Sequence, residues 1–288
     1  MKEDAADRAK TFDANGSIKR LVDETLERLQ EFRRKYPFTE DPDQIERLTA
    51  DDIFKTDTGE MGSFFRYIEH QLKQLGHLTI YGSKVYHNIR AQLEDFKELL
   101  HIVVDKEKSI AEKVDAPWQE IKGLGGDSHI AKKIIFCFNY ETGRVAPIFK
   151  TEHMEYFLQT INDAAVFPLR YESMSLGEKY EYLTQKLIEA KQTSEVTKPW
   201  EITYFSWFLY QTYPPPRMLT TPTQRKTGDD KTGLEQKQQY GAFIELLNEL
   251  RRQEKISAEQ WREYSNNWSK NPEARQTLTE TLTKLKSG

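Results

Sequence analysis

Apolar residues recur at helical spacing through most of this chain, and this periodicity constrains the fold more than any other feature of the sequence. A stripe from Ile18 to Phe32 repeats every three or four residues. Such spacing places side chains on one face of an α-helix. A second stripe has the same spacing and consists of Val85, Ile89, Leu93, Phe96, Leu100 and Val103. The pattern predicts a mainly α-helical protein, a multi-helix globular domain with few or no strands.

Helix-start signals support this prediction. Ser175 and Glu178 form a capping box, in which each residue bonds the backbone of the other at the start of a helix. Thr49 is placed to cap another helix. Segments 77–82 and 144–149 are the only candidates for strands, and both patterns are short. The second of the two contains a proline, which cannot donate to a sheet.

The composition changes after residue 213, and this change predicts a division of the chain. Residues 1–213 carry the long helical patterns and form the main domain. Residues 214–237 are rich in Thr, Gln, Lys, Pro and Gly, which favours a flexible linker or loop. Residues 238–288 contain three further helical patterns. They predict a C-terminal helical segment that forms a small bundle.

Charge and composition bound the function. The net charge is −4 and the sequence pI is about 6.0, so nucleic-acid binding requires a local cationic patch on an acidic body. A single cysteine excludes an intrachain disulfide and a cysteine-based zinc site. The first ten residues, MKEDAADRAK, lack the apolar core of a signal peptide, and no apolar run reaches the roughly 20 residues of a membrane span. We expect a cytoplasmic protein without a membrane partner.

In the stretch KGLGGDSHIAKKIIFCFN, residues 122–139, the first part, KGLGGDSHIAKK, is the strongest candidate for ligand contact, whereas IIFCFN is expected to lie in the core. A glycine-rich turn that leads into a helix presents free backbone N–H groups and the positive end of the helix dipole, and this geometry binds phosphate. Lys132 and Lys133 follow on the first turns of the expected helix, which Ser128 can cap. The stretch has neither the Walker A pattern nor the G-x-G-x-x-G pattern, so a nucleotide loop is disfavoured. A plain turn at the entrance to a buried helix is the alternative.

The turn also resembles the helix-hairpin-helix element of DNA-binding proteins, here near residues 117–138. Gly123, Leu124, Gly125, Ala131 and Ile134 imitate that element, although Ala131 comes about two residues later than its usual spacing. The resemblance implies that amides of the turn hold one DNA phosphate without reading bases. Trp118, beside the turn, is the aromatic residue most suited to a ligand. The predicted DNA-binding set is Trp118, Lys122, Gly123, Gly125, Gly126, Ser128, Lys132 and Lys133.

A longer resemblance covers about residues 50–160. The order LTADDIF, SFFRYIEHQLKQLG, APWQEIKGLGGD, AKKIIFCFN and APIFKTEHMEYFL resembles the N-terminal, non-ATPase regions of McrB-type modification-dependent restriction proteins. Those regions recognise DNA, often modified DNA, while a separate motor and nuclease cut it. The chain has no Walker motif, so the resemblance implies a recognition or accessory role beside a separate motor or nuclease subunit.

Catalytic signatures are weaker. Asp115 with the triplet Glu120–Lys122 imitates the PD-(D/E)xK pattern of metal-dependent nucleases, but those groups belong on adjacent strands and this neighbourhood predicts a turn and short helix. The six histidines show no metal-binding pair, and Cys137 lies between two phenylalanines, as a buried packing residue does. We expect no catalytic residue, metal or cofactor.

These observations favour a non-catalytic DNA-recognition or accessory component of a restriction or defence system. It would contact phosphate through the glycine-rich turn and the helix N-terminus. The alternative is a helical protein-interaction or scaffold module without nucleic-acid binding. A metal-dependent nuclease is the third hypothesis.

Overall fold

The computed structural model describes residues 1–76, 83–127, 129–162 and 167–215, together with parts of the chain between residues 243 and 287. The protein is mainly α-helical, as the periodicity predicts. The chain divides into two compact units, Met1–Arg217 and Met218–Gly288. Most of the predicted linker and the candidate strand 77–82 lie outside the described residues.

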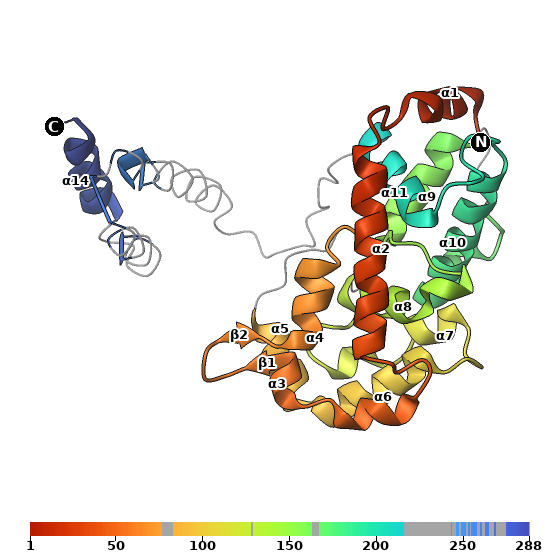
Figure 1. Ribbon diagram of the computed structural model, residues 1–288, viewed down its shortest axis with the longest axis horizontal. Helices are drawn as coiled ribbons and strands as arrows, with labels where there is room; N and C mark the ends of the chain where they lie inside the picture. The colour runs from red at the N-terminus through yellow and green to blue at the C-terminus, as the bar shows by residue number, and fades with distance from the viewer. Residues whose placement is uncertain are drawn as a thin grey trace. The chain divides into compact units, whose positions relative to one another are not determined.

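The helices of the first unit follow one another along the chain with short connections (Figure 1). Among the described residues, five brief 3₁₀ or π turns are interspersed: η1 (Pro42–Arg47), η2 (Tyr67–Gln71), η3 (Trp118–Glu120), η4 (Tyr140–Thr142) and η5 (Tyr171–Ser173). The α-helices are α1 (Glu3–Thr11), α2 (Ser17–Lys35), α3 (Ala50–Ile53), α4 (Ser63–Arg66), α5 (Ser83–Ala91), α6 (Leu93–Val104), α7 (Ile110–Val114), α8 (His129–Asn139), α9 (Thr151–Ile161), α10 (Leu176–Gln192) and α11 (Ile202–Thr212).

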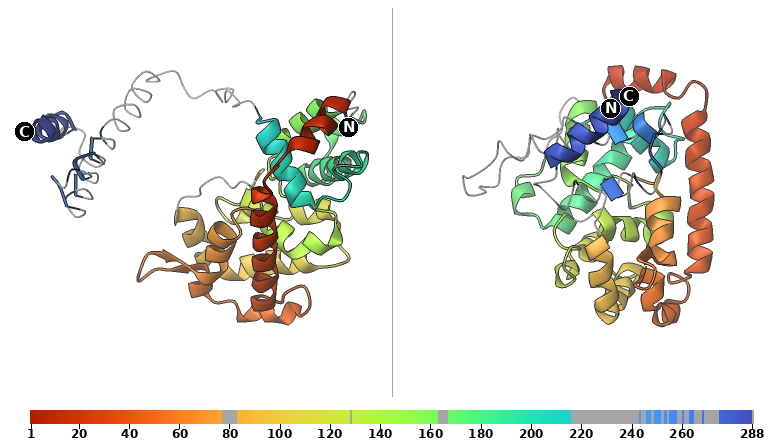
Figure 2. Two further views of the ribbon diagram at one scale, coloured as in Figure 1. Left: turned by 45° about the horizontal axis from the view of Figure 1, so that its top comes forward. Right: turned by 90° about the vertical axis from the view of Figure 1, so that its left-hand side faces the viewer.

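Helix α8 is the centre of this unit, because every one of its residues is buried. It contacts α2, α6 and α7, while α10 packs against α7 and α9. Helix α2 runs along the outside of the unit, in front of α8 in Figure 1 and at the edge in the right-hand view of Figure 2. Because its polar residues are buried as well as its apolar ones, α8 is surrounded by other elements.

An aromatic cluster joins the end of α2 to the end of α8. The ring of Phe138 lies 5.4 Å from that of Phe32 and 5.4 Å from that of Phe38, measured between centroids. Phe64 packs against Phe32 at 5.6 Å. Rings in such clusters bury large apolar areas and hold their neighbours in fixed geometry. This cluster fixes the corner of the fold at which α2 and α8 both end.

Two predicted helix starts are confirmed. The Thr49 hydroxyl accepts the N–H of Asp52, and the Asp52 side chain accepts the N–H of Thr49, which makes a capping box at α3. Ser175 and Glu178 form the same arrangement at α10. A capping box of this kind satisfies two N–H groups that a helix otherwise leaves without partners.

Three details differ from prediction. The stripe from residue 85 to residue 103 spans two helices, because Gln92 leaves helical geometry (φ −116°, ψ 47°) and its side-chain amide donates to Glu120 O and Asp95 Oδ2. Segment 144–149 is not a strand. Among the described residues the strands are β1 (Phe54–Lys55) and β2 (Glu60–Met61), an antiparallel hairpin that the sequence patterns did not indicate.

The second unit has an apolar core of its own. Its described helix is α14 (Arg275–Ser287). The buried residues that pack together in this unit are Phe243, Leu247, Leu250, Ile256, Trp268 and Leu282. Nowhere in the described part of the chain is a helix both long and apolar enough to cross a membrane.

Candidate functional site

The glycine-rich turn adopts the backbone geometry that glycine favours. Gly123 and Gly126 have φ angles of 104° and 70°, in the left-handed region that other residues rarely adopt. A Cβ atom on Gly125 would lie 2.7 Å from Cβ of Gln119, closer than such atoms approach. Backbone conformation and close packing therefore account for three of the glycines without a ligand.

The structure corrects the predicted role of the two lysines that follow the turn. Lys132 and Lys133 are 1% and 0% exposed. The Lys132 ammonium donates to Phe149 O at 3.0 Å and pairs with Asp127. The Lys133 ammonium donates to two backbone carbonyls, at 2.5 Å and 2.8 Å. Because α8 is enclosed on every side, both lysines point into the core, and neither ammonium lies where a DNA phosphate could reach it.

Trp118 is likewise in the core. It is 2% exposed, and its indole Nε1 donates to Lys113 O at 2.9 Å. The predicted ligand-side role of this ring is wrong for the same reason as for the two lysines. Of the remaining predicted residues, Lys122, Gly123 and Gly126 are exposed and Gly125 is half-buried, whereas Ser128 lies outside the described residues.

Asp127 also changes the electrostatics at the start of α8. Its carboxylate pairs with Lys132 and accepts the Thr151 hydroxyl at 3.1 Å. A carboxylate in this position already compensates the positive end of a helix dipole. It would also repel a phosphate brought to the same place. The N-terminus of α8 is therefore occupied by the protein's own anion.

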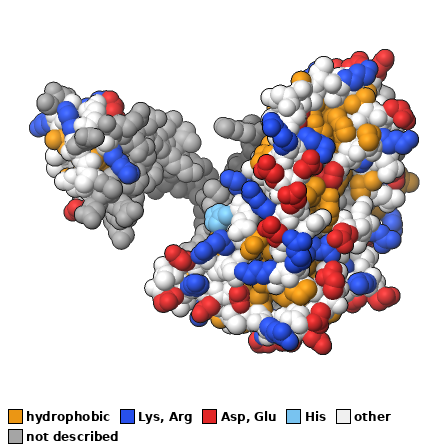
Figure 3. Space-filling model, viewed as in Figure 1, with side chains coloured by type: hydrophobic (Ala, Val, Ile, Leu, Met, Phe, Trp, Pro, Cys, Tyr) orange, Lys and Arg blue, Asp and Glu red, His pale blue; other side chains and the backbone are white. Residues whose placement is uncertain are grey.

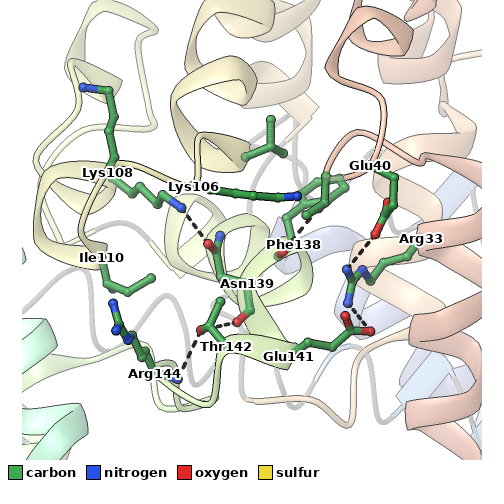
Figure 4. Close-up of a pocket in the computed structure, with 13 residues that line it drawn as sticks. Arg33, Glu40, Lys106, Lys108, Ile110, Phe138, Asn139, Glu141, Thr142 and Arg144 are labelled. Atoms are coloured by element: carbon green, nitrogen blue, oxygen red, sulfur yellow. Dashed lines mark hydrogen bonds and ion pairs between the residues drawn. The ribbon is translucent and has the colours of Figure 1, made fainter.

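A pocket of about 320 Å³ lies at the opposite end of α8. Figure 4 shows its position between the end of α2, the connection from α6 to α7, and the η4 turn that follows α8. We call it the α8 pocket. Its lining residues are Arg33, Thr39, Glu40, Val104, Lys106, Lys108, Ile110, Lys113, Phe138, Asn139, Glu141, Thr142 and Arg144.

Cations outnumber carboxylates in this lining. The lining includes five Lys or Arg side chains and two carboxylates, those of Glu40 and Glu141. Both carboxylates bind one cation, Arg33, whose Nη2 lies 3.2 Å from Glu40 Oε1 and whose Nη1 lies 2.6 Å from Glu141 Oε1. The remaining four cations have no carboxylate among the lining residues to balance them.

Three of these cations are available to a ligand. Within the described residues, the side chains of Lys106, Lys108 and Arg144 form no hydrogen bond or ion pair. In Figure 4 the Lys106 side chain extends across the pocket toward Phe138, Arg144 lies at the other edge near Ile110, and Lys108 points outward from the rim. The pocket therefore presents cationic groups at its mouth from more than one side.

The fourth cation is fixed in the wall of the pocket. Lys113 is buried, and its Nζ donates to Asn139 Oδ1 at 2.7 Å. The Asn139 amide donates in turn to Val103 O at 3.0 Å and Ile135 O at 2.9 Å, which fixes the orientation of its oxygen. Burial lowers the pKa of Lys113, while the nearby carboxylate of Asp105 raises it. An added anion at this wall would stabilise the charged form.

Apolar side chains form the floor. Val104, Ile110 and Phe138 line the pocket and are each at least nine-tenths buried. Polar groups around an apolar floor are the usual composition of a ligand site. A second hollow of about 430 Å³ lies against the first, and both are lined by Arg33, Glu40 and Glu141. The Arg33 ion pairs thus stand where the two hollows meet.

Beyond the pocket, charges of both signs are mixed over the face of the first unit that Figure 3 shows. Basic and acidic side chains alternate there rather than gathering in one broad cationic stripe. Extended tracking of a nucleic-acid backbone uses such a stripe. Any anion binding on this face is therefore expected to be local. Among the described residues, no three His, Cys, Asp or Glu side chains gather as metal ligands would.

Sequence reasoning missed the α8 pocket. Its cations come from the ends of separate elements, from Arg33 on α2 to Arg144 after η4. The one local signal is Lys106 and Lys108, two lysines close together directly after the apolar end of α6. Nothing in the spacing of the other residues links them, because folding alone brings them together.

No protein-family model, curated protein or solved structure matches this chain. The resemblance of residues 50–160 to McrB-type recognition regions therefore stays a prediction, and the chemistry of the α8 pocket is the basis for assigning a function.

Proposed function

We propose that the protein is a non-catalytic recognition component that binds nucleic acid, with the α8 pocket as its phosphate-binding site. The observation that carries the proposal is the set of Lys106, Lys108 and Arg144, three cations whose side chains form no hydrogen bond or ion pair among the described residues, around a pocket lined in part by apolar side chains. Lys and Arg side chains bind phosphate through short, charge-assisted hydrogen bonds.

The proposal relocates the contact that the sequence predicts. The glycine-rich turn cannot use Lys132 or Lys133, and Asp127 opposes an anion at the start of α8. The pocket lies at the C-terminal end of α8, which is the negative end of the helix dipole. Its lining outweighs this with a local excess of positive charge on a chain whose net charge is −4. Exposed Lys122 remains a candidate for a second phosphate contact.

DNA, with or without base modification, is the ligand that the resemblance to McrB-type regions favours. In that setting the chain would act beside a separate motor or nuclease subunit in a restriction or defence system. Phosphate contacts position a protein on DNA and carry no sequence information. Selectivity for a base or a modification would therefore need contacts other than the rim cations.

A binding titration with the full chain tests the proposal. Fluorescently labelled unmodified duplex, base-modified duplex and single strand are titrated at two salt concentrations. Because phosphate binding releases condensed counterions, we expect affinity for at least one of these ligands to fall steeply as salt rises. Absence of salt-dependent binding to all three would contradict the proposed function.

A helical protein-interaction module is the second candidate. The observation that favours it is the separate compact unit Met218–Gly288 with its own apolar cluster. If this unit drives self-association, the molar mass measured in solution corresponds to more than one copy for the full chain and to one copy for a chain lacking residues 234–288. An unchanged monomer in both cases would count against self-assembly through this unit.

A further inference from the structure

The size of the α8 pocket limits what part of a nucleic acid can enter it. A volume of about 320 Å³ falls at the lower end of the range for small-molecule sites. A duplex presents its phosphates along a rod and keeps its bases stacked inside, so no interior nucleotide of a duplex projects far enough to fill the pocket. The end of a strand and a free nucleotide are both small enough.

The charge of the pocket distinguishes between kinds of phosphate. Its lining has five cations and two carboxylates, an excess of three positive charges. The carboxylates of Asp105 and Glu112 do not line the pocket, but both act on the buried Lys113 and Glu112 acts on Lys108 as well, so they offset part of this excess. An internal phosphodiester carries one negative charge, whereas a phosphomonoester carries about 1.5 to 2 at neutral pH. The phosphomonoester therefore compensates more of the excess positive charge of the pocket than an internal phosphodiester does.

Local hydrogen bonds hold the rim in place. The Thr142 hydroxyl donates to Asn139 O at 2.7 Å and accepts the N–H of Arg144 at 3.2 Å. This arrangement closes the turn after α8 and fixes the backbone from which the Arg144 side chain extends. A cation on a fixed backbone loses less freedom when an anion binds.

The apolar floor supplies a surface for the other part of a nucleotide. Val104, Ile110 and Phe138 come from three different segments and all line the pocket. The ring of Phe138 is held between Phe32 and Phe38. Bases bind against apolar and aromatic surfaces with little dependence on sequence.

We propose that the α8 pocket binds one nucleotide that carries a phosphomonoester, with its phosphate on Lys106 and Arg144, toward which the Lys108 side chain turns from its outward orientation, and its base against Val104, Ile110 and Phe138. This proposal rests on the proposed function and narrows it to the phosphorylated end of a strand or a free mononucleotide. Both sources offer the same chemistry, a dianionic phosphate joined to a planar base.

The test compares three single strands of one sequence, internally labelled, with a phosphate at the 5′ end, at the 3′ end or at neither. Titrated against the full chain, at least one phosphorylated strand should bind about tenfold more tightly than the unphosphorylated one. Equal affinity for all three strands would overturn the inference and leave the proposed function standing. Failure of all three to bind would contradict the proposed function itself.

Competition separates the two sources and tests the floor. A free deoxynucleoside monophosphate should displace the phosphorylated strand, whereas the nucleoside without phosphate should not. Inorganic phosphate and a phosphoserine peptide should each need a concentration at least about tenfold higher, because neither carries a base. If inorganic phosphate or the phosphoserine peptide displaced the strand at the same concentration as the mononucleotide, the part of the inference that places a base on the floor would be overturned.

A matched pair of variants assigns the effect to the rim. Arg144→Gln should lower the ratio of affinities for phosphorylated and unphosphorylated strands to about one third of its wild-type value or less. Arg144→Lys should keep most of the wild-type ratio. Lys84→Gln removes an exposed cation that does not line the pocket and should leave the ratio unchanged. An unchanged ratio in Arg144→Gln, with a melting temperature equal to that of the wild type, would overturn the assignment.

Discussion

Buried lysines recur in this molecule and show why residue type alone did not locate the site. Lys133 ends on two backbone carbonyls, and Lys191 does the same with Lys198 O and Trp200 O, both at 2.8 Å. A long apolar stem with a charged end can join a helix to backbone carbonyls that are buried in the core. The spacing that identified α8 as a buried helix was sufficient to predict its core, but the charges on it favoured the opposite placement for Lys132 and Lys133.

Lys133 gives a prediction about pH. Burial lowers the pKa of its ammonium from 10.5 to about 8. The unfolded chain therefore binds more protons than the folded protein between these values, and the free energy of unfolding rises with pH across this window. Between pH 8 and pH 10.5, we expect the free energy of unfolding of the wild type to rise by about 3 kcal/mol relative to that of Lys133→Met, at about 1.4 kcal/mol per pKa unit.

The measurement is urea unfolding of both proteins at intervals across that range. Lys84→Met, at an exposed position on α5, serves as the control and should follow the wild-type profile. Parallel profiles for the wild type and Lys133→Met would contradict the assignment of this charge to the core.

At the scale of elements, the starts of helices and their buried faces were predictable from the sequence, whereas the break within a helical stripe was not. The boxes at Thr49 and Ser175 are local patterns, so the sequence is sufficient to identify them. The break at Gln92 depends on a bond to Glu120 O, which is 28 residues away. The apolar stripe continues through the break, because both helices turn the same kind of face toward the core.

The contact between α7 and α10 gives a prediction about packing. A Cβ atom on Gly177 would lie 2.1 Å from Ala111 O and 2.7 Å from Asp115 Cγ. The N–H of Gly177 also donates to Asp115 Oδ1 at 2.7 Å. Gly177→Ala must separate the two helices, and overpacking of this kind costs about 1–3 kcal/mol of unfolding free energy.

Chemical denaturation measures that loss. Glu189→Ala, on an exposed position of the same helix, is the matched control and should change stability by less than about 0.5 kcal/mol. Equal stability of the two variants would show that α7 and α10 are not in close contact.

At the scale of the whole molecule, the periodicity correctly predicted a mainly α-helical chain but did not predict the α8 pocket. The core of the first unit is formed by buried residues between Ala5 and Leu209, and the second unit has a separate cluster. The pocket collects residues from Arg33 to Arg144, whose distances depend on how α2, α7 and α8 pack. The spacing of these residues along the sequence does not predict such distances.

This division of the core gives a prediction about truncation. Because the apolar core cluster of the first unit contains no residue beyond 217, a chain of residues 1–217 should fold alone. We expect its melting temperature to lie within about 2 °C of the corresponding transition in the full chain. A change of 1 kcal/mol in the free energy of unfolding would shift the melting temperature by more than this. A fragment that lacks a cooperative thermal transition would contradict the independence of this unit.

The salt dependence of binding tests the central claim, that the α8 pocket is the phosphate site, most directly. The logarithm of affinity for a 5′-phosphorylated single strand is measured against the logarithm of salt concentration for three proteins. They are the wild type, the pocket variant Lys106→Gln/Lys108→Gln/Arg144→Gln, and the control Lys55→Gln/Lys73→Gln/Lys84→Gln, which removes the same charge from exposed positions outside the pocket. We predict that the pocket variant binds more weakly and that its slope is shallower by about 2, while the control keeps the wild-type slope. Equal slopes for the pocket variant and the wild type would contradict the account.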